Sequence, residues 1–335
     1  MTGDNDPFAD QTLLRELADG GFHSGAGLAT RLGVSRTAVW KKIHALAGLG
    51  LDIRATPGRG YRIEGGLDLL DPAAVYAAAG DAVRNVIDDA EFLSSVDSTN
   101  KRLLERSPPP PGRCHLCLAD FQTAGRGRRG RTWVTPYAGG VCLSLGWTFP
   151  AQPPEFSAMS LVTGLACCFA LEEAGLDGVG LKWPNDLVCQ SGKLGGILIE
   201  IRGEADGPVH VVIGIGLNVR LPTTIRKDLE KIAAWPPVDL EQCMALRPSR
   251  SKLAGLLAKH LVASLESFTA NGFMPFAEDF AARDMVAGQA VTLHCGDEVI
   301  DGTAAGIDND GALLLDTAEG RQRFYGGEVS LRLRQ

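Results

Sequence analysis

Gly125-Arg126-Gly127-Arg128-Arg129-Gly130-Arg131 is the stretch on which the interpretation of this chain turns. Four arginines and three glycines alternate here in a protein whose formal net charge is −7. The stretch has no apolar face to bury, so it predicts a loop. Glycine lets backbone approach a ligand closely, and arginine offers a planar, permanently charged fork to phosphate or carboxylate. The loop either closes over an anion or is a basic turn for nucleic acid, and its neighbours decide between the two.

Two motifs further along the chain favour the anion. Lys182-Trp183-Pro184-Asn185-Asp186 predicts a rigid polar turn between two strands, which is also compatible with a purely structural role. Lys193-Leu194-Gly195-Gly196-Ile197 follows, and its two glycines leave a strand without side chains, as suits a flat ligand lying on backbone. Lys193 beside this floor can serve as a point charge for carboxylate or phosphate.

A third glycine-rich stretch, Ile213-Gly214-Ile215-Gly216-Leu217-Asn218-Val219, predicts a second glycine-lined wall. No helix pattern follows it directly, as a dinucleotide-binding loop requires, and the chain contains no Walker A sequence. Ser98-Thr99-Asn100 has two interpretations. These short polar side chains either cap a helix over 101–106 or present donors and acceptors to a small polar ring system.

The first 66 residues predict a winged helix-turn-helix. Helices are expected over 11–18, 24–31 (capped by Ser24) and 36–46, and strands over 51–53 and 60–63 flank a Pro-Gly turn. Between Arg31 and Arg62 there are seven basic residues and one acidic residue, a local charge of +6. A basic recognition helix and wing indicate DNA binding; a winged helix used for protein contact is the alternative.

The rest of the chain predicts a larger α/β domain and a small barrel. The larger domain has strand-like runs at 114–119, 141–148, 196–201 and 209–214, and helices at 67–85, 157–174 and 251–268. Short strands between 290 and 333, separated by turn residues, predict a β-barrel of roughly 50 residues. The fold class is therefore α+β, with expected domains 1–66, 67–277 and 278–335.

Composition indicates a soluble cytoplasmic protein. Apolar residues make up 45% and charged residues 22% of the chain, and no secretory signal pattern is visible. The most apolar stretch, 158–171, is expected to be a buried core helix too short to span a bilayer. Eight scattered cysteines favour reduced core thiols, and Cys114 and Cys117 lack the second pair that a zinc site needs.

Together these motifs resemble one family, the bifunctional biotin–protein ligases that also repress biotin biosynthesis. The resemblance covers nearly the whole chain. It implies an N-terminal winged helix-turn-helix, a central biotin/lipoate-ligase-like mixed α/β catalytic domain and a C-terminal SH3-like barrel, the last signalled by 311–315 and 326–331.

The resemblance also implies a two-step reaction and its partners. Biotin and MgATP give biotinyl-5′-AMP and pyrophosphate, and biotin then passes to a lysine on the biotin carboxyl carrier domain of a biotin-dependent carboxylase. The adenylate is the corepressor, since adenylate binding favours a homodimer that places two winged helices on operator DNA. A cytoplasmic ligase of this kind needs no membrane.

Roles for individual residues follow from the same resemblance. Arg126 and Arg128 close over carboxylate and phosphate, Lys193 holds the carboxylate and then the acyl-phosphate oxygens, and Lys182 is a further electrostatic candidate. Asn185 and Asp186 organise the metal and phosphate region. The residues expected to bind biotin or the adenylate are Ser98, Thr99, Asn100, Gln122, Arg126, Gly127, Arg128, Arg129, Lys193, Gly195, Gly196, Asn218 and Trp235, the last as an aromatic lid for adenine. The residues expected to contact DNA are Ser35, Arg36, Thr37, Trp40, Lys41, His44 and Arg59.

Two other functions compete with this one. A transcription factor whose α/β domain only senses a small molecule would need no cluster of anion-binding arginines beside Lys193. A lipoate ligase shares the fold class but lacks the arginine-glycine run.

Overall fold

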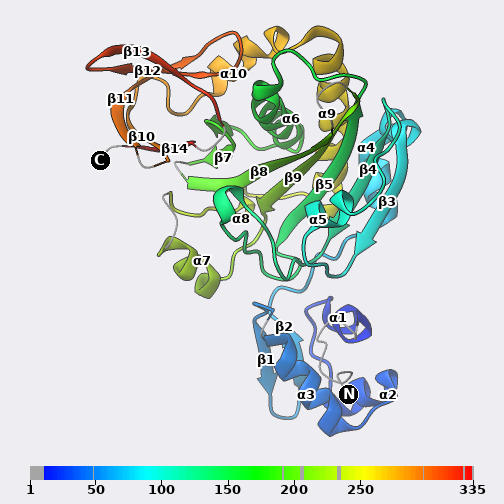
Figure 1. The fold of residues 1–335 in the computed structure, drawn as a ribbon. Coiled ribbons are helices and arrows are strands. Elements are labelled where there is room, and N and C mark those ends of the chain that lie inside the picture. Colours follow the sequence, from blue (N-terminus) through cyan, green and yellow to red (C-terminus); the bar gives the residue numbers. More distant parts are fainter. Residues whose placement is uncertain are drawn as a thin grey trace.

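A computed structural model describes residues 11–47, 49–190, 192–203, 207–231, 235–296, 298–326 and 329–333 of the chain. Its elements form three groups along the sequence: a small helical group with a two-stranded sheet, a seven-stranded mixed sheet with helices, and a five-stranded antiparallel sheet (Figure 1). Of the residues in the 326–331 motif named above, Gly327 and Glu328 lie outside the described residues, as do Ala233 and Ala234 just before Trp235.

The N-terminal group has the predicted winged helix-turn-helix order. Its helices are α1 (Gln11–Leu17), α2 (Gly25–Leu32) and α3 (Arg36–Ala47), and its strands are β1 (Ile53–Thr56) and β2 (Gly60–Ile63). Ser24 caps α2 as expected, because its hydroxyl oxygen accepts from the backbone N–H of Gly27 at 3.0 Å. The strand predicted over 51–53 was placed too early, since antiparallel pairing with β2 begins at Ile53 and continues to Thr56.

The central sheet has the order β3-β4-β5-β9-β8-β7-β6, in which only β3 and β4 run parallel. The strands are β3 (Ile87–Leu93), β4 (Cys114–Ala119), β5 (Gly140–Phe149), β6 (Gly180–Lys182), β7 (Asp186–Cys189), β8 (Gly192–Gly203) and β9 (Val209–Asn218). The predicted strands 196–201 and 209–214 are longer in the structure. Both glycine-rich stretches therefore lie inside paired strands, which places them at the middle of the sheet.

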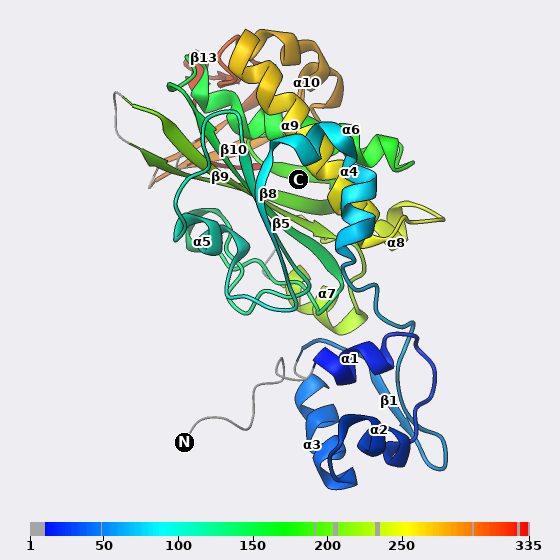
Figure 2. The ribbon, with the colours of Figure 1, turned by 90° about the vertical axis from the view of Figure 1, so that its right-hand side faces the viewer.

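Three helices cover one face of this sheet and a single short helix covers part of the other (Figure 2). The large core lies under α4 (Pro72–Val86), α6 (Met159–Glu173) and α9 (Arg250–Asn271), and α5 (Thr99–Leu104) lies opposite. Because side chains alternate along a strand, Val211, Ile213 and Ile215 of β9 enter the large core. Residues 212, 214 and 216 then face the α5 side, where the pocket is.

The linking helix is shorter than predicted. The sequence suggested a helix over 67–85, but α4 begins at Pro72 with Asp71 as its N-cap and changes direction at Gly80. Proline favours the first turn of a helix, which explains the later start.

The segment Phe156–Glu173, which contains α6, is long and apolar enough to cross a membrane by length and composition, with mean hydropathy 1.3 over 18 residues. The expectation that it is too short was therefore wrong. Its burial decides its role, since 67% of this window is inside the protein, as expected for a core helix.

The C-terminal sheet has the order β13-β12-β11-β10-β14 and follows a short helical segment. Its strands are β10 (Ala290–Cys295), β11 (Glu298–Ile307), β12 (Leu313–Thr317), β13 (Gly320–Phe324) and β14 (Val329–Leu333), preceded by η3 (Met274–Phe276) and α10 (Ala277–Arg283). Trp183 of the predicted polar turn is fully buried, and its indole N–H donates to Gly311 O at 3.2 Å. The turn therefore attaches the C-terminal sheet to the central one.

One buried arginine joins the linker of the N-terminal group to the central sheet. Arg250 is completely buried, and its guanidinium donates to Asp68 O (2.6 Å), Asp120 Oδ1 (2.6 Å) and Gly140 O (2.7 Å). Asp120 and Gly140 are the two ends of the segment that contains the arginine-glycine loop. Beyond the loop, Tyr137 packs into the winged-helix core and its N–H donates to Leu49 O at 3.1 Å.

Candidate active site

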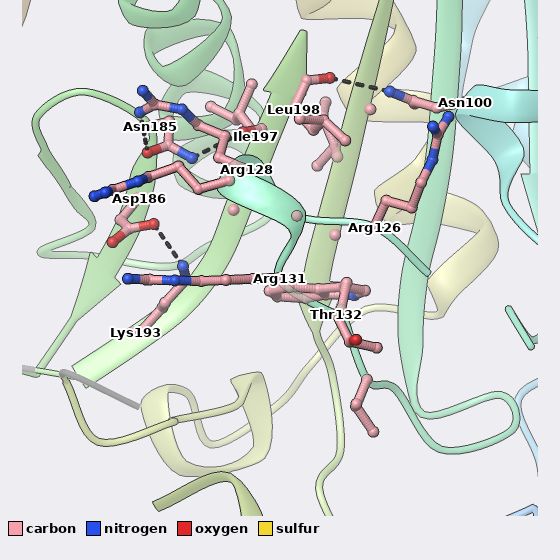
Figure 3. A pocket seen from close by; sticks show the side chains of 18 of the residues that line it. Asn100, Arg126, Arg128, Arg131, Thr132, Asn185, Asp186, Lys193, Ile197 and Leu198 are labelled. Carbon is pink, nitrogen blue, oxygen red and sulfur yellow. Dashed lines mark hydrogen bonds and ion pairs between the residues drawn. The ribbon is translucent and has the colours of Figure 1, made fainter. Parts of the chain in front are cut away.

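A pocket of about 560 Å³ opens on the α5 side of the central sheet, within the roughly 300–1,000 Å³ typical of small-molecule sites. Its walls come from α5, the loop at 126–134, the turn before β7, and strands β8 and β9, and Leu331 of β14 also lines it. Figure 3 shows Asn100 and Arg126 at one end of the pocket and Asn185, Asp186 and Lys193 at the other. We call these the amide end and the lysine end.

At the amide end, the Ser98-Thr99-Asn100 motif caps a helix, as the first interpretation predicts, and it also lines the pocket. Ser98 is the N-cap of α5, while Thr99 and Asn100 begin the helix and line the pocket. Gln122 Oε1 accepts from the N–H of Thr99 at 2.9 Å and lies 3.1 Å from its hydroxyl. Ser144 Oγ lies 2.7 Å from Thr99 Oγ1 and 2.5 Å from Asn100 Oδ1.

The glycines of β9 are required by side chains of the protein itself. A Cβ at Gly214 would lie 2.2 Å from Asn100 Oδ1, and a Cβ at Gly216 would lie 2.3 Å from the Trp133 indole. Trp133 also approaches Gly196, so the indole is one wall of the pocket and lies on the glycine floor.

Gly195 does not have the predicted place in the floor. It is not among the pocket-lining residues, and its absent Cβ would meet Gly216 O at 2.7 Å and Leu187 at 3.0 Å. Packing within the sheet therefore accounts for this glycine.

At the lysine end, one carboxylate holds two lysines. Asp186 Oδ1 accepts from Lys193 Nζ at 2.5 Å, and Asp186 Oδ2 accepts from Lys182 Nζ at 3.0 Å. Burial alone would raise the pKa of Asp186, but the ammonium groups of Lys193 and Lys182 outweigh it and lower that pKa to about 2. The Asp186 side chain is 15% exposed and the Lys182 side chain 8% exposed, so this is a desolvated charge cluster.

The arginine-glycine loop lies across the pocket as a short hairpin. Arg126 Nη2 donates to Glu200 Oε2 at 3.0 Å, and Arg128 donates to Asn185 Oδ1 at 3.0 Å and to Gly326 O. Burial lowers the pKa of the Arg128 guanidinium, which reflects a charge taken out of water. Arg129 has a left-handed backbone with φ of 57°, a conformation that the loop imposes on a non-glycine residue.

Trp235 and Asn218 complete the predicted set. Trp235 lines the pocket, and Lys182 Nζ lies 5.7 Å from the centre of its ring. Asn218 also lines the pocket, but its amide N–H groups donate to Val238 O (3.0 Å) and Lys193 O (3.4 Å). Asn218 therefore joins the segment after Trp235 to the strand that carries Lys193.

The pocket is strongly cationic in an acidic protein. Its lining contains six cationic side chains and one carboxylate, a formal charge of +5, against −7 for the whole chain. The six are Arg126, Arg128, Arg129, Arg131, Lys182 and Lys193. Low-dielectric walls with one sign of charge concentrate the field on a bound ion, so the arrangement suits an anion that bears several negative charges.

Apart from Gly195, the structure brings every predicted ligand-binding residue to this one pocket. Sequence reasoning missed Trp133, Ser144 and Glu200. Trp133 lies two residues after the arginine run and could have been noticed for that reason, whereas Ser144 and Glu200 lie within ordinary strand sequences that carry no local signal.

The residues expected to contact DNA are all exposed. Arg36, Trp40 and His44 lie four residues apart along α3, so they share a face, and the rings of Trp40 and His44 are 4.0 Å apart. Arg59 of the wing is stacked over Phe22 at 4.0 Å.

Comparison with known proteins agrees with this architecture. The family model of the Biotin/lipoate A/B protein ligase family matches residues 92–218, the Biotin protein ligase C terminal domain matches 286–332, and an HTH domain matches 10–62. The fold and the pocket thus define a member of the biotin and lipoate protein ligase class with an added helix-turn-helix.

Full-length relatives identify the family more narrowly. The chain is 36% identical over 321 residues to the "Bifunctional ligase/repressor BirA" of Salmonella typhimurium strain LT2, covering 96% of this chain and 97% of that protein. It is 35% identical over 320 residues to the protein of the same name from Escherichia coli strain K12, covering 96% of each. The chain belongs to the family of bifunctional biotin ligase/repressor proteins.

A solved structure extends the comparison to the fold. The biotin protein ligase from Aquifex aeolicus, in complex with biotin and ATP, is 31% identical with a TM-score of 0.60 and covers 74% of this chain and 100% of that one.

Proposed function

We propose that this protein is an ATP-dependent biotin–[biotin carboxyl carrier protein] ligase that also represses biotin biosynthesis. It joins biotin to AMP and then transfers biotin to an acceptor lysine. The observation that carries the proposal is a pocket with a formal charge of +5, in which one end holds two lysines and the other is lined by amide and hydroxyl groups. Biotin has a matching division, with a polar ureido ring at one end and a carboxylate at the other.

The hydroxyl groups at the amide end supply one proton fewer than their contacts need. Three contacts join Ser144 to Thr99, Ser144 to Asn100 and Thr99 to Gln122, but the two hydroxyl groups supply only two protons. One acceptor therefore remains open to a donor from a ligand. A ureido ring carries two N–H donors and one carbonyl acceptor, so it can supply the missing proton.

The lysine end suits the first chemical step. The biotin carboxylate oxygen attacks the α-phosphorus of ATP, the bond to the β-phosphate oxygen breaks, and pyrophosphate leaves. Two anions must meet, so the site has to neutralise both. Lys193 and Lys182 are already held 2.5 and 3.0 Å from the Asp186 carboxylate, and Arg128 and Arg131 approach from the loop above them.

The second step transfers the acyl group. The acceptor lysine nitrogen, as the free amine, attacks the biotinyl carbonyl carbon and loses a proton to solvent, the bond to the phosphate oxygen breaks, and AMP leaves. The mixed anhydride would hydrolyse in open water, and the loop that crosses the pocket shields it. Trp235 offers an aromatic surface to the adenine ring.

The described residues do not form a metal site of their own. They contain no group of three or more His, Cys, Asp and Glu side chains that could hold an ion. Both oxygens of Asp186 accept from lysines, and Asn185 Oδ1 accepts from Arg128. We propose that Mg²⁺ enters as part of the substrate MgATP, and that Asp186 organises the phosphate region through its lysines.

The repressor role follows from the exposed basic face of the winged helix. We propose that biotinyl-5′-AMP is the corepressor, that the adenylate-bound protein is a homodimer on operator DNA, and that the carrier domain of a biotin-dependent carboxylase is the competing partner. These roles belong to a cytoplasmic protein.

One assay tests the ligase. Purified protein is mixed with ATP, labelled biotin and a carrier domain, and biotin on the acceptor is measured by mass. Absence of labelled acceptor, together with tight biotin binding, would leave the small-molecule sensor as the better interpretation. Labelling by lipoate and not by biotin would instead indicate a lipoate ligase.

A further inference from the structure

The arginine-glycine loop is a hairpin with one anchor on each side of the pocket. Within it, the N–H of Trp133 donates to Gly125 O (2.9 Å) and the N–H of Gly127 donates to Arg131 O (2.7 Å). Arg128 anchors one side at Asn185 and Gly326. Arg126 anchors the other side at Glu200 of β8.

The two anchors lie at opposite ends of the pocket (Figure 3). The Arg126 guanidinium is beside Asn100, at the amide end, whereas Asp186 and Lys193 are at the other end. An arginine that neutralised the reacting carboxylate and phosphate would be needed at the lysine end. The position of Arg126 is therefore unsuited to the clamp role that the family resemblance implies.

The chain supplies its own carboxylate for Arg126. Glu200 Oε2 accepts from Arg126 at 3.0 Å and from Asn100 Nδ2 at 2.9 Å. The Glu200 side chain is 24% exposed, so water screens this pair only in part. Asn100 is buried, and its other amide contacts are with Ser144 and Leu198 O.

We propose that Arg126 is a positioning residue, and that Glu200 holds it so that the loop stays anchored above the amide end. Anion neutralisation then falls to Arg128, Arg131 and the two lysines. This inference rests on the proposed biotin ligase function, but it concerns how that site is assembled.

The same contacts link the loop to the ligand. A hydrogen-bonded chain runs from Arg126 through Glu200 and Asn100 to Ser144, and from there to Thr99. A ligand head group that hydrogen-bonds at the amide end holds the Asn100 side chain in place. Asn100 and Arg126 both donate to the Glu200 carboxylate. Anchoring of the loop is therefore coupled to binding of the correct ring system at the amide end. This coupling selects the ligand before the first chemical step.

A double-mutant cycle tests the proposal. The variants are Arg126→Met, which keeps the length of the side chain, Glu200→Gln, which keeps an acceptor for Asn100 but removes the charge, and both together. The measured quantities are KM for biotin, the rate of pyrophosphate formation at saturating biotin and ATP, and the dissociation rate of biotinyl-5′-AMP.

Each single variant is expected to raise KM for biotin and the adenylate dissociation rate by about tenfold, as for loss of one hydrogen bond to a charged group. The saturated rate should change less than about threefold, and the double variant should be no worse than the worse single one. Trypsin should also cleave the ligand-free loop faster in Glu200→Gln, a readout that does not depend on activity.

Glu91→Gln is the matched control. Glu91 of β3 is 20% exposed, pairs with Arg102 of α5 at 2.8 Å and does not line the pocket, so its loss should leave KM, dissociation and loop cleavage unchanged. A large fall in the saturated rate of Arg126→Met with Glu200→Gln unaltered would overturn the proposal, as would additive effects in the double variant. If wild-type protein makes no adenylate, the proposed function fails instead.

Discussion

Replacing Gly214 with alanine puts a methyl group where the Asn100 amide lies. The added Cβ would be 2.2 Å from Oδ1, 2.8 Å from Cγ and 2.9 Å from Nδ2 of Asn100. Gly214 does not have the positive φ that disfavours other residues, so its backbone accepts alanine. The clash is thus confined to one side chain, and Asn100 must leave its contacts with Ser144 and Glu200.

The expected cost can be worked from these contacts. Overpacking of a filled site costs about 1–3 kcal/mol, and loss of a buried hydrogen bond costs about 1 kcal/mol. Alanine returns about 0.4–1 kcal/mol by restricting the unfolded chain. We therefore expect Gly214→Ala to lower the free energy of unfolding by about 2 kcal/mol and to weaken biotin binding, because the amide end is no longer organised.

Urea unfolding and biotin calorimetry measure both effects. Gly207→Ala is the control, since no atom lies within 4 Å of its added Cβ and its backbone conformation is ordinary. In the double variant with Asn100→Ala the clash is absent, so the loss should be smaller than the sum of the single losses by about 1–2 kcal/mol. If Gly214→Ala and Gly207→Ala unfold with the same free energy, the close approach of Asn100 is not what requires glycine.

Further predictions concern the pocket, the operator and the linker. Arg128→Ala should speed adenylate dissociation while changing the free energy of unfolding less; an unaltered off-rate, measured by displacement, would exclude an anion clamp. Lys193→Ala should abolish pyrophosphate release because it removes one of the two cations at the reacting phosphate, and a normal release rate would contradict this role. Deletion of residues 1–66 should remove operator binding, so footprinting that persists would disprove the DNA assignment. Arg250→Met leaves the Asp120 carboxylate buried without the arginine that pairs with it. It should lower the free energy of unfolding in urea by about 3–5 kcal/mol, and a decrease below about 1 kcal/mol would refute this role of Arg250.

The segment that follows the anchored loop contacts the DNA-binding group. In this segment Tyr137 packs with the winged-helix core, and its backbone N–H donates to Leu49 O. Arg220, which follows β9, donates to Glu64 O at 3.2 Å. Both segments lead directly from the pocket walls to the winged helix, so the two activities are physically adjacent in this chain.

Local sequence was sufficient for the features that depend on neighbouring residues. The Ser24 cap, the basic face of α3 and strand β4 were all predicted at or near their observed limits, because capping and side-chain periodicity act over a few residues. The arginine run was correctly predicted as a loop over the pocket, since a stretch of arginine and glycine has no apolar face to bury. Motif resemblance then identified the family.

Only the tertiary structure decided what each polar group meets. Arg126 and Glu200 are separated by 74 residues, and nothing in either segment predicts that strand β8 carries the carboxylate to the loop. The glycines of β9 were expected to form a glycine-lined wall for a ligand, yet Asn100 and Trp133 occupy the space that they leave. Such pairings depend on strand register and on the crossing of distant segments, which local composition does not encode. The sequence by itself thus determined the class of protein and the charge of its pocket, and the fold determined which charges bind the substrate and which hold the loop.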